Sequence, residues 1–185
     1  SIMRASKVIS KEDGDIMFGK FVIPEASVFY QSTNKSYAFV NLRPLVPGHV
    51  LVIPEPIVPL MDQLSQDHYL DLWKTVRTVQ SILKVAYPQT TAFNVAVQDG
   101  SAAGQSVPHV HVHILPRCSS QDGDVYGAER NDEIYEDLQT WAPRDDELKN
   151  PIPLQVLPDD ARTDRTRQQM ADEAAQYRAV AESSK

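Results

Sequence analysis

The sequence has a single cysteine and no long apolar run, and each shortage excludes a class of protein. Cys118, alone among 185 residues, rules out an internal disulfide and a cysteine-based zinc finger, and it suits a reducing compartment. No stretch approaches the ~18–20 apolar residues that span a membrane. Residues 1–15 lack the continuous apolar segment of a signal peptide. We therefore expect a protein of the cytoplasm, and also of the nucleus, that does not contact membranes.

Positive charge is also in short supply. The chain carries 18 Lys and Arg against 25 Asp and Glu, a formal net charge of −7. This balance argues against general binding to nucleic-acid backbones, so we expect no nucleic-acid partner. A small anionic ligand can still bind, but it needs a local site. The length fits one domain with room for an appendage.

Short segments rich in β-branched and aromatic residues, separated by turn residues, predict a sheet. The expected strands are residues 16–22, 27–31, 37–42, 49–54, 92–98 and 109–115. The best helix follows Ser65 as N-cap and ends at Pro88, with an apolar stripe at three- and four-residue steps: Tyr69, Leu72, Trp73, Val76, Val79, Leu83 and Ala86. Because strands and helices do not alternate regularly, we expect an α+β fold with a mainly antiparallel sheet of five to six strands.

The chain after Pro116 divides into three parts. Residues 131–138 predict a short helix, and the proline-rich residues 139–162 predict a loop or a disordered insert. Residues 163–185 predict a C-terminal helix and tail with a thin apolar stripe, so we expect this helix to pack weakly. The expected organisation is a flexible leader (1–15), one domain (16–138), the insert, and the terminal helix.

Three of the five histidines fall within five residues, in the segment Pro-His-Val-His-Val-His-Ile-Leu-Pro. Side chains alternate across a strand, so His109, His111 and His113 would share one face, with the valines on the other. Three interpretations are open: a solvated stripe, a zinc site completed from elsewhere, and nucleophilic catalysis by a neutral imidazole. For zinc, the nearby sequence offers no cysteine pair and only Asp99 as a close acid.

The loop that leads into this segment favours chemistry on a phosphoryl group. Gln98, Gln105 and Ser106 offer side-chain hydrogen bonds, and Gly104 permits a close approach of the backbone. The loop is no P-loop, because it lacks the Gly-Lys-Ser/Thr ending and opens a strand rather than a helix.

Several segments together resemble the fragile histidine triad branch of the histidine triad (HIT) superfamily. They cover Phe18-Gly19 and residues 38–44 (AFVNLRP), 46–52 (VPGHVLV), 98–106 (QDGSAAGQS), 109–117 (HVHVHILPR), 131–135 (NDEIY) and 170–174 (MADEA). Gln105 is similar to the glutamine of the dinucleoside polyphosphate hydrolases, whereas nucleoside phosphoramidases usually carry a smaller hydroxyl residue there. The resemblance implies a HIT-like fold with one long helix and a C-terminal helix.

The resemblance also implies roles for residues. His111 would be the nucleophile, His113 would contact the α-phosphate, His109 would hold His111, and His49 would support the network. Gln105 would bind near the bridging oxygen, and Asn41 would bind the ribose. Gln98, Gly104, Ser106 and Val107 would line the phosphate path, while the apolar slot for the base would be formed by Phe18, Phe39 and Leu51. Without the resemblance, those last three are equally explained as core residues.

By the same resemblance the chain would hydrolyse diadenosine triphosphate to AMP and ADP, as a homodimer whose two sheets join. Mg²⁺ or Mn²⁺ would arrive with the substrate, and no tightly bound protein metal is expected. The alternative is a dinucleotide-binding signalling module in which the substrate-loaded dimer is the active species. The features that would serve such signalling are Tyr135 and residues 142–185. Pro108 departs from relatives that have lysine there, which removes one cation from the phosphate path.

Overall fold

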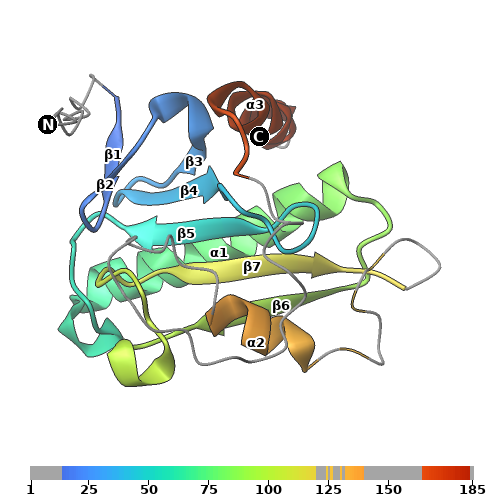
Figure 1. Ribbon diagram of the computed structural model, residues 1–185. Coiled ribbons are helices and arrows are strands. Elements are labelled where there is room, and N and C mark those ends of the chain that lie inside the picture. Colours follow the sequence, from blue (N-terminus) through green and yellow to red (C-terminus); the bar gives the residue numbers. More distant parts are fainter. Residues whose placement is uncertain are drawn as a thin grey trace, which may run out of the picture.

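A computed structural model describes residues 14–119, 124, 126, 130, 132–139 and 164–183 (Figure 1). The predicted leader lies outside these residues except at its last two positions, and the predicted insert lies outside them except at residue 139. Within the described ranges, no helix is both long and apolar enough to cross a membrane.

Five antiparallel strands form the main sheet, in the spatial order β3-β4-β5-β7-β6. Their bounds are β3 Val28–Gln31, β4 Ser36–Val40, β5 Val50–Pro54, β6 Ala92–Val97 and β7 Val112–Arg117. All five residues of β5 are buried, and the strand lies in the centre of the sheet. The predicted α+β class is confirmed.

The first predicted strand, residues 16–22, is wrong as a single element. The structure has a hairpin of β1 Ile16–Phe18 and β2 Phe21–Ile23, with Ile16 paired to Ile23. Gly19 has a φ of +56°, and a Cβ built there would lie 2.7 Å from Val107 Cγ1. Glycine is therefore needed both for the turn and for its close approach to the loop before the histidines.

The predicted strand 109–115 begins three residues later than expected, at Val112. Residues 109–111 lie outside the ladder of strand hydrogen bonds because the backbone groups there have other partners. The Pro54 carbonyl accepts from the His109 ring, and the Val110 N–H donates to the Val58 carbonyl. Side chains still alternate through this stretch, because Val110 and Val112 enter the core that α1 covers. The histidines point to the other side.

Helix α1, Gln66–Ala86, packs on one face of the sheet, behind it in Figure 1. Ser65 is its N-cap as predicted, accepting from the His68 N–H. Most of the predicted stripe is buried, but Tyr69 stays 40% exposed. Helix α2, Glu133–Gln139, places Ile134 and Leu138 against Leu115 on the opposite face.

The C-terminal helix α3, Arg167–Ser183, packs more tightly than predicted. Met170, Ala174 and Tyr177 join the main core with Phe29 of β3, and Tyr177 is fully buried. The Tyr177 hydroxyl lies 2.8 Å from that of Tyr87 after α1. The expectation of weak packing is therefore wrong. The thin apolar stripe is enough to anchor the helix in the core, because α3 packs against both α1 and the edge of the sheet at β3.

Candidate active site

Four of the five histidines meet on the face of the sheet opposite α1. His109, His111 and His113 come from the segment that ends in β7, and His49 directly precedes β5. All four are at most 1% exposed. Register brings them together, because His113 pairs with Leu51 across the two central strands. The solvated stripe is therefore excluded.

Backbone groups fix which ring nitrogen of each supporting histidine carries the proton. The Leu45 N–H donates to His49 Nδ1 at 3.1 Å, so the proton of His49 is on Nε2. That nitrogen lies 3.0 Å from His113 Nδ1, which must accept, so His113 keeps its own proton on Nε2. His113 therefore presents an N–H donor on the side of its ring away from His49.

The middle histidine has the opposite arrangement. His111 Nδ1 lies 2.7 Å from the main-chain carbonyl of His109, and because a carbonyl only accepts, the proton is on Nδ1. The Nε2 atom then carries a lone pair. The rings of His111 and His113 have centroids 5.0 Å apart, so a ring that presents a lone pair lies beside a ring that presents an N–H donor.

The main-chain carbonyl of His109 binds the His111 ring, while the imidazole of His109 forms hydrogen bonds with two other segments. Its Nδ1 accepts from the Gly19 N–H at 3.1 Å, and its Nε2 lies 2.8 Å from the Pro54 carbonyl. The imidazole thus ties the β1–β2 turn to the end of β5. Phe18, beside that turn, contacts His111 edge-on at a centroid distance of 5.1 Å.

Burial keeps these rings neutral. Loss of hydration lowers the pKa of His111 to about 4 and, helped by the charge of Arg165, that of His49 to about 3. The pKa of His113 falls well below its ordinary value through burial, with the two neighbouring imidazoles lowering it further. Burial also lowers the pKa of His109. At neutral pH the site therefore offers imidazoles, not imidazolium ions.

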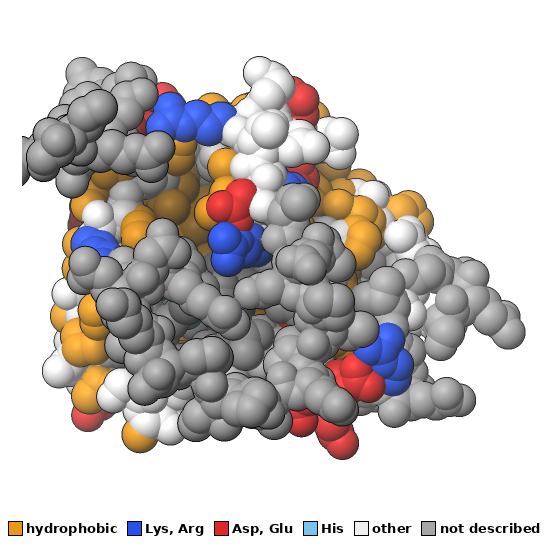
Figure 2. Space-filling model, in the orientation of Figure 1, with side chains coloured by type: hydrophobic (Ala, Val, Ile, Leu, Met, Phe, Trp, Pro, Cys, Tyr) orange, Lys and Arg blue, Asp and Glu red, His pale blue; other side chains and the backbone are white. Residues whose placement is uncertain are grey.

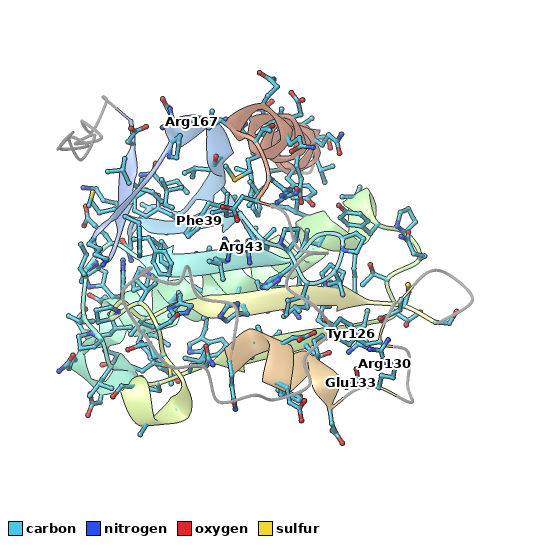
Figure 3. All side chains as sticks on the ribbon, viewed as in Figure 1. Phe39, Arg43, Tyr126, Arg130, Glu133 and Arg167 are labelled. Atoms are coloured by element: carbon cyan, nitrogen blue, oxygen red, sulfur yellow. The ribbon has the colours of Figure 1, made fainter. Side chains whose placement is uncertain are left out.

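An apolar cleft of about 290 Å³ opens beside the histidines, between the β1–β2 hairpin, β4 and the start of α3. Its lining includes four residues predicted for base and ribose: Phe18, Phe39, Leu51 and Asn41. The first three are also packed into one apolar cluster, so both interpretations of them apply. Figure 2 shows apolar side chains at the floor of this hollow, and Figure 3 shows Phe39 between Arg167 and Arg43.

Asn41 is held firmly at the border between cleft and histidines. Its side-chain oxygen accepts from the Arg43 N–H at 3.0 Å, and its amide nitrogen lies 3.4 Å from His49 Nδ1. Its main-chain carbonyl accepts from Arg165, which in turn pairs with Glu173 of α3. The C-terminal segment therefore reaches the site.

The predicted phosphate loop runs from Gln98 to Val107, past one end of the histidines. Gly104 has a φ of +88°, and a Cβ there would lie 2.8 Å from the Gln98 amide nitrogen. The Gln98 side-chain oxygen is buried and accepts no hydrogen bond from a described residue. Gln105 donates to the Pro59 carbonyl at 2.7 Å, while Ser106 is exposed.

Among the described residues, no group of three or more His, Cys, Asp and Glu side chains is arranged to hold a metal ion. Asp99, the nearby acid considered as a ligand, instead accepts from the Met61 N–H at 2.8 Å.

Comparison with known families identifies the family to which this chain belongs. The family model described as "HIT domain" matches residues 22–120, more than half of the chain. The chain belongs to the HIT domain family. The match spans β3 to β7 and includes all four clustered histidines.

The fragile histidine triad branch is shown by relatives along nearly the whole chain. This HIT protein is 44% identical over 180 residues to the bifunctional bis(5'-adenosyl)-triphosphatase/adenylylsulfatase FHIT of Arabidopsis thaliana, covering 97% of this chain and 92% of that one. It is 38% identical to the bis(5'-adenosyl)-triphosphatase of Dictyostelium discoideum, covering 66% of this chain and 76% of that one.

Solved structures of related proteins also match this chain. The nitrilase–Fhit fusion protein NitFhit of Caenorhabditis elegans matches with a TM-score of 0.65 and 32% identity, covering 92% of this chain and 31% of that one. The diadenosine triphosphate hydrolase of Plasmodium falciparum, solved with cyclomarin A, matches with a TM-score of 0.56 and 31% identity, covering 71% and 86%.

Sequence reasoning missed several residues of the cleft, and three of them come from other parts of the chain than the predicted four. Ile23, Arg165 and Met170 all line the cleft. Met170 lay on the predicted stripe of the last helix, but periodicity does not say what a stripe packs against. For Arg165 the only available signal was its place beside the helix start, which is weak.

Proposed function

We propose that this HIT protein hydrolyses diadenosine triphosphate to AMP and ADP through a covalent AMP–His111 intermediate. The observation that carries the proposal is the paired tautomers: His111 presents a lone pair on Nε2 beside the N–H of His113. The apolar cleft alongside is suited to an adenine base, with Asn41 at the ribose. The names of its relatives support a phosphoanhydride hydrolase.

The reaction takes place in two displacements. The His111 Nε2 lone pair attacks the α-phosphorus, the bond from phosphorus to the bridging oxygen breaks, and ADP leaves with that oxygen. The His113 N–H donates to a phosphoryl oxygen as negative charge gathers there. Water then attacks the same phosphorus, a proton is released, and AMP leaves His111 free again. Gln105, after turning from the Pro59 carbonyl, would bind near the bridging oxygen.

A divalent cation belongs to the substrate in this proposal. Mg²⁺ or Mn²⁺ on the phosphate chain would reduce the repulsion between the dinucleotide and a protein of net charge −7. In this proposal the neutral imidazoles attack and donate hydrogen bonds, and they do not ligate the cation.

The edge strand β6 supports a proposal about a second copy of the chain. This strand ends the sheet, and among the described residues it pairs only with β7, while Val95 on it is 38% exposed. An edge of this kind favours pairing with another strand. We propose a homodimer whose two sheets join at β6.

Hydrolysis of adenylyl sulfate is a second candidate activity. One relative carries adenylylsulfatase in its name. In this proposal the cleft and the histidines would bind only the adenylyl half of a substrate, so any good leaving group on the α-phosphorus is compatible with them.

The covalent step has a direct test. Brief exposure of the protein to diadenosine triphosphate, followed by acid quench and intact-mass measurement, should show a gain of one AMP. His111→Ala should show neither the adduct nor turnover, whereas His68→Ala, on α1 and outside the cluster, should show both. Near-normal turnover by His111→Ala would overturn the assignment of the nucleophile.

A further inference from the structure

We propose that the Ser27 hydroxyl binds the edge of the purine base that lies opposite the ribose, and thereby selects the substituent at position 6 of that base. This inference rests on the proposed function and extends it to specificity. Ser27 ends a short 3-10 helix, Glu25–Ser27, between β2 and β3. Neither the histidine pattern nor the segments that carry the family resemblance include it.

The Ser27 side chain is a buried polar group in the wall of the apolar cleft. The residue is 3% exposed and is one of those that line the cleft. Its main-chain N–H donates to the Pro24 carbonyl at 2.9 Å, but its hydroxyl has no hydrogen-bond partner among the described residues. Because a buried hydroxyl without a partner costs free energy, such a group calls for an explanation. A base bound in the cleft supplies one, as the missing partner.

The register of the main sheet places Ser27 at the end of the cleft away from the histidines. His113 on β7 pairs with Leu51 on β5. Leu51 pairs with Phe39 on β4, and Phe39 with Val28 on β3, so one row of residues crosses four strands. Ser27 directly precedes Val28, which puts it three strand spacings, each of about 4.8 Å, from the histidine end of the row. The ribose and then the base would occupy this interval, with the far edge of the base at Ser27.

The other polar side chains among the described lining residues cannot take this role. They are Asn41, Arg43, Arg165 and Arg167. The Asn41 side-chain oxygen already accepts from the Arg43 N–H. A guanidinium only donates, so none of the three arginines can accept from an amino group at position 6. Arg167, exposed at the start of α3, could donate to an oxygen there, and the experiment below therefore includes it. Ser27 can both accept and donate.

A hydroxyl at this place predicts an order among purines. It accepts from the 6-amino group of adenine and, after rotation about its C–O bond, donates to the 6-oxo group of hypoxanthine. It has nothing to bind at position 6 of an unsubstituted purine. One neutral hydrogen bond should therefore favour adenine and hypoxanthine over unsubstituted purine by about two- to tenfold in kcat/KM. Since the contact is remote from the reacting phosphorus and equal in ground and transition states, the difference should lie in KM.

The experiment compares bases on one leaving group. The p-nitrophenyl esters of AMP, IMP and purine riboside 5'-monophosphate are assayed with the parent, Ser27→Ala and Arg167→Ala. We expect Ser27→Ala to bring all three esters to the kcat/KM that the parent has for the unsubstituted purine, while Arg167→Ala keeps the parent's order. Ser27→Cys, with a weaker donor and acceptor of similar size, should lose most of the preference. Ser81→Ala, an exposed serine of α1 that donates to the Arg77 carbonyl, is the matched control and should keep the order.

Three outcomes would overturn the inference: an unchanged order in Ser27→Ala, an equal loss on all three esters, which a merely structural role would give, or loss of the order in Arg167→Ala alone. Far-UV circular dichroism and the thermal midpoint confirm that each variant is folded. Failure of the proposed function has a different signature, because the parent protein would then cleave none of the three esters. The same comparison is in that case made on the Kd values of the three 5'-monophosphates, measured by calorimetry.

Discussion

The Arg165 side chain donates two hydrogen bonds, of 3.0 and 2.5 Å, to the main-chain carbonyl of Asn41, a residue 124 positions earlier in the chain. Glu173 pairs with the same guanidinium from the next turns of α3. Since Asn41 borders both the cleft and His49, the C-terminal helix holds one wall of the site in place. Arg165 is a positioning residue, because it acts through Asn41.

Removal of Arg165 should weaken substrate binding more than chemistry. Charged hydrogen bonds of this kind contribute about 1.5–3 kcal/mol, so Arg165→Ala should raise KM for diadenosine triphosphate by about tenfold or more. Arg165→Lys keeps the charge but not the fork of donors, and should recover part of the loss. The control is steady-state kinetics with Arg178→Ala, because Arg178 donates to the Ala26 carbonyl at 3.3 Å, outside the site. A loss in kcat alone would contradict this role.

Stability should fall as the pH is lowered from about 6.5 toward 4. His111 and His49 have folded-state pKa values near 4 and 3, below the ordinary value of 6.5, so the unfolded chain binds more protons in that interval. The stabilisation by neutral, buried imidazoles is therefore complete above pH 6.5 and is lost on acidification, by on the order of 3 kcal/mol for each such ring. Urea unfolding across this interval measures the slope, and His49→Asn should make it shallower.

The acid limb of catalysis should lie equally low. Since protonation of His111 removes the attacking lone pair, kcat/KM should stay level down to about pH 5 and fall near pH 4, where His111 titrates. The profile is measured with the folded fraction monitored at each pH. An inflection near 6.5 would show that the nucleophile is more hydrated in solution than in this structure.

Gln105 should matter for departure of the leaving group. Its amide donates to the Pro59 carbonyl at 2.7 Å, so it must turn to reach a substrate. Gln105→Ala should lower kcat for diadenosine triphosphate by about 100- to 1,000-fold, the range for loss of one transition-state hydrogen bond. The effect should be smaller on the p-nitrophenyl ester of AMP, whose leaving group departs readily without help. Gln89→Ala, a glutamine in the turn after α1, is the control.

Asp71 should affect stability and not activity. This buried carboxylate of α1 accepts from Ser32 Oγ at 2.5 Å and Ser36 Oγ at 2.6 Å, tying the β3–β4 hairpin to the helix. Asp71→Ala leaves these donors without their acceptor and should lower the free energy of unfolding by about 2–4 kcal/mol. Exposed Asp62→Ala should change it little. Denaturant titration checks the first effect, and an unchanged kcat/KM at low temperature checks the second.

Local sequence determined much of this protein. The period of two placed the histidines of residues 109–113 on one face, and this survived even though the strand ladder begins only at Val112. The N-cap at Ser65 and the buried stripe of α1 followed from neighbouring residues alone. Such features depend on contacts between residues close in the chain, or on which face of an element is apolar and therefore buried. Both can be inferred from the sequence alone.

Tertiary structure decided the rest. Which nitrogen of each histidine carries a proton depends on backbone groups of Gly19, Leu45 and His109, and the first of these lies 90 positions from its partner. The chain's one cysteine and missing apolar runs excluded whole classes of protein but could not reveal that Arg165 supports Asn41. Burial and long-range hydrogen bonds arise only when the sheet, the hairpin and the last helix come together, and these set the pKa and the tautomer of each clustered histidine.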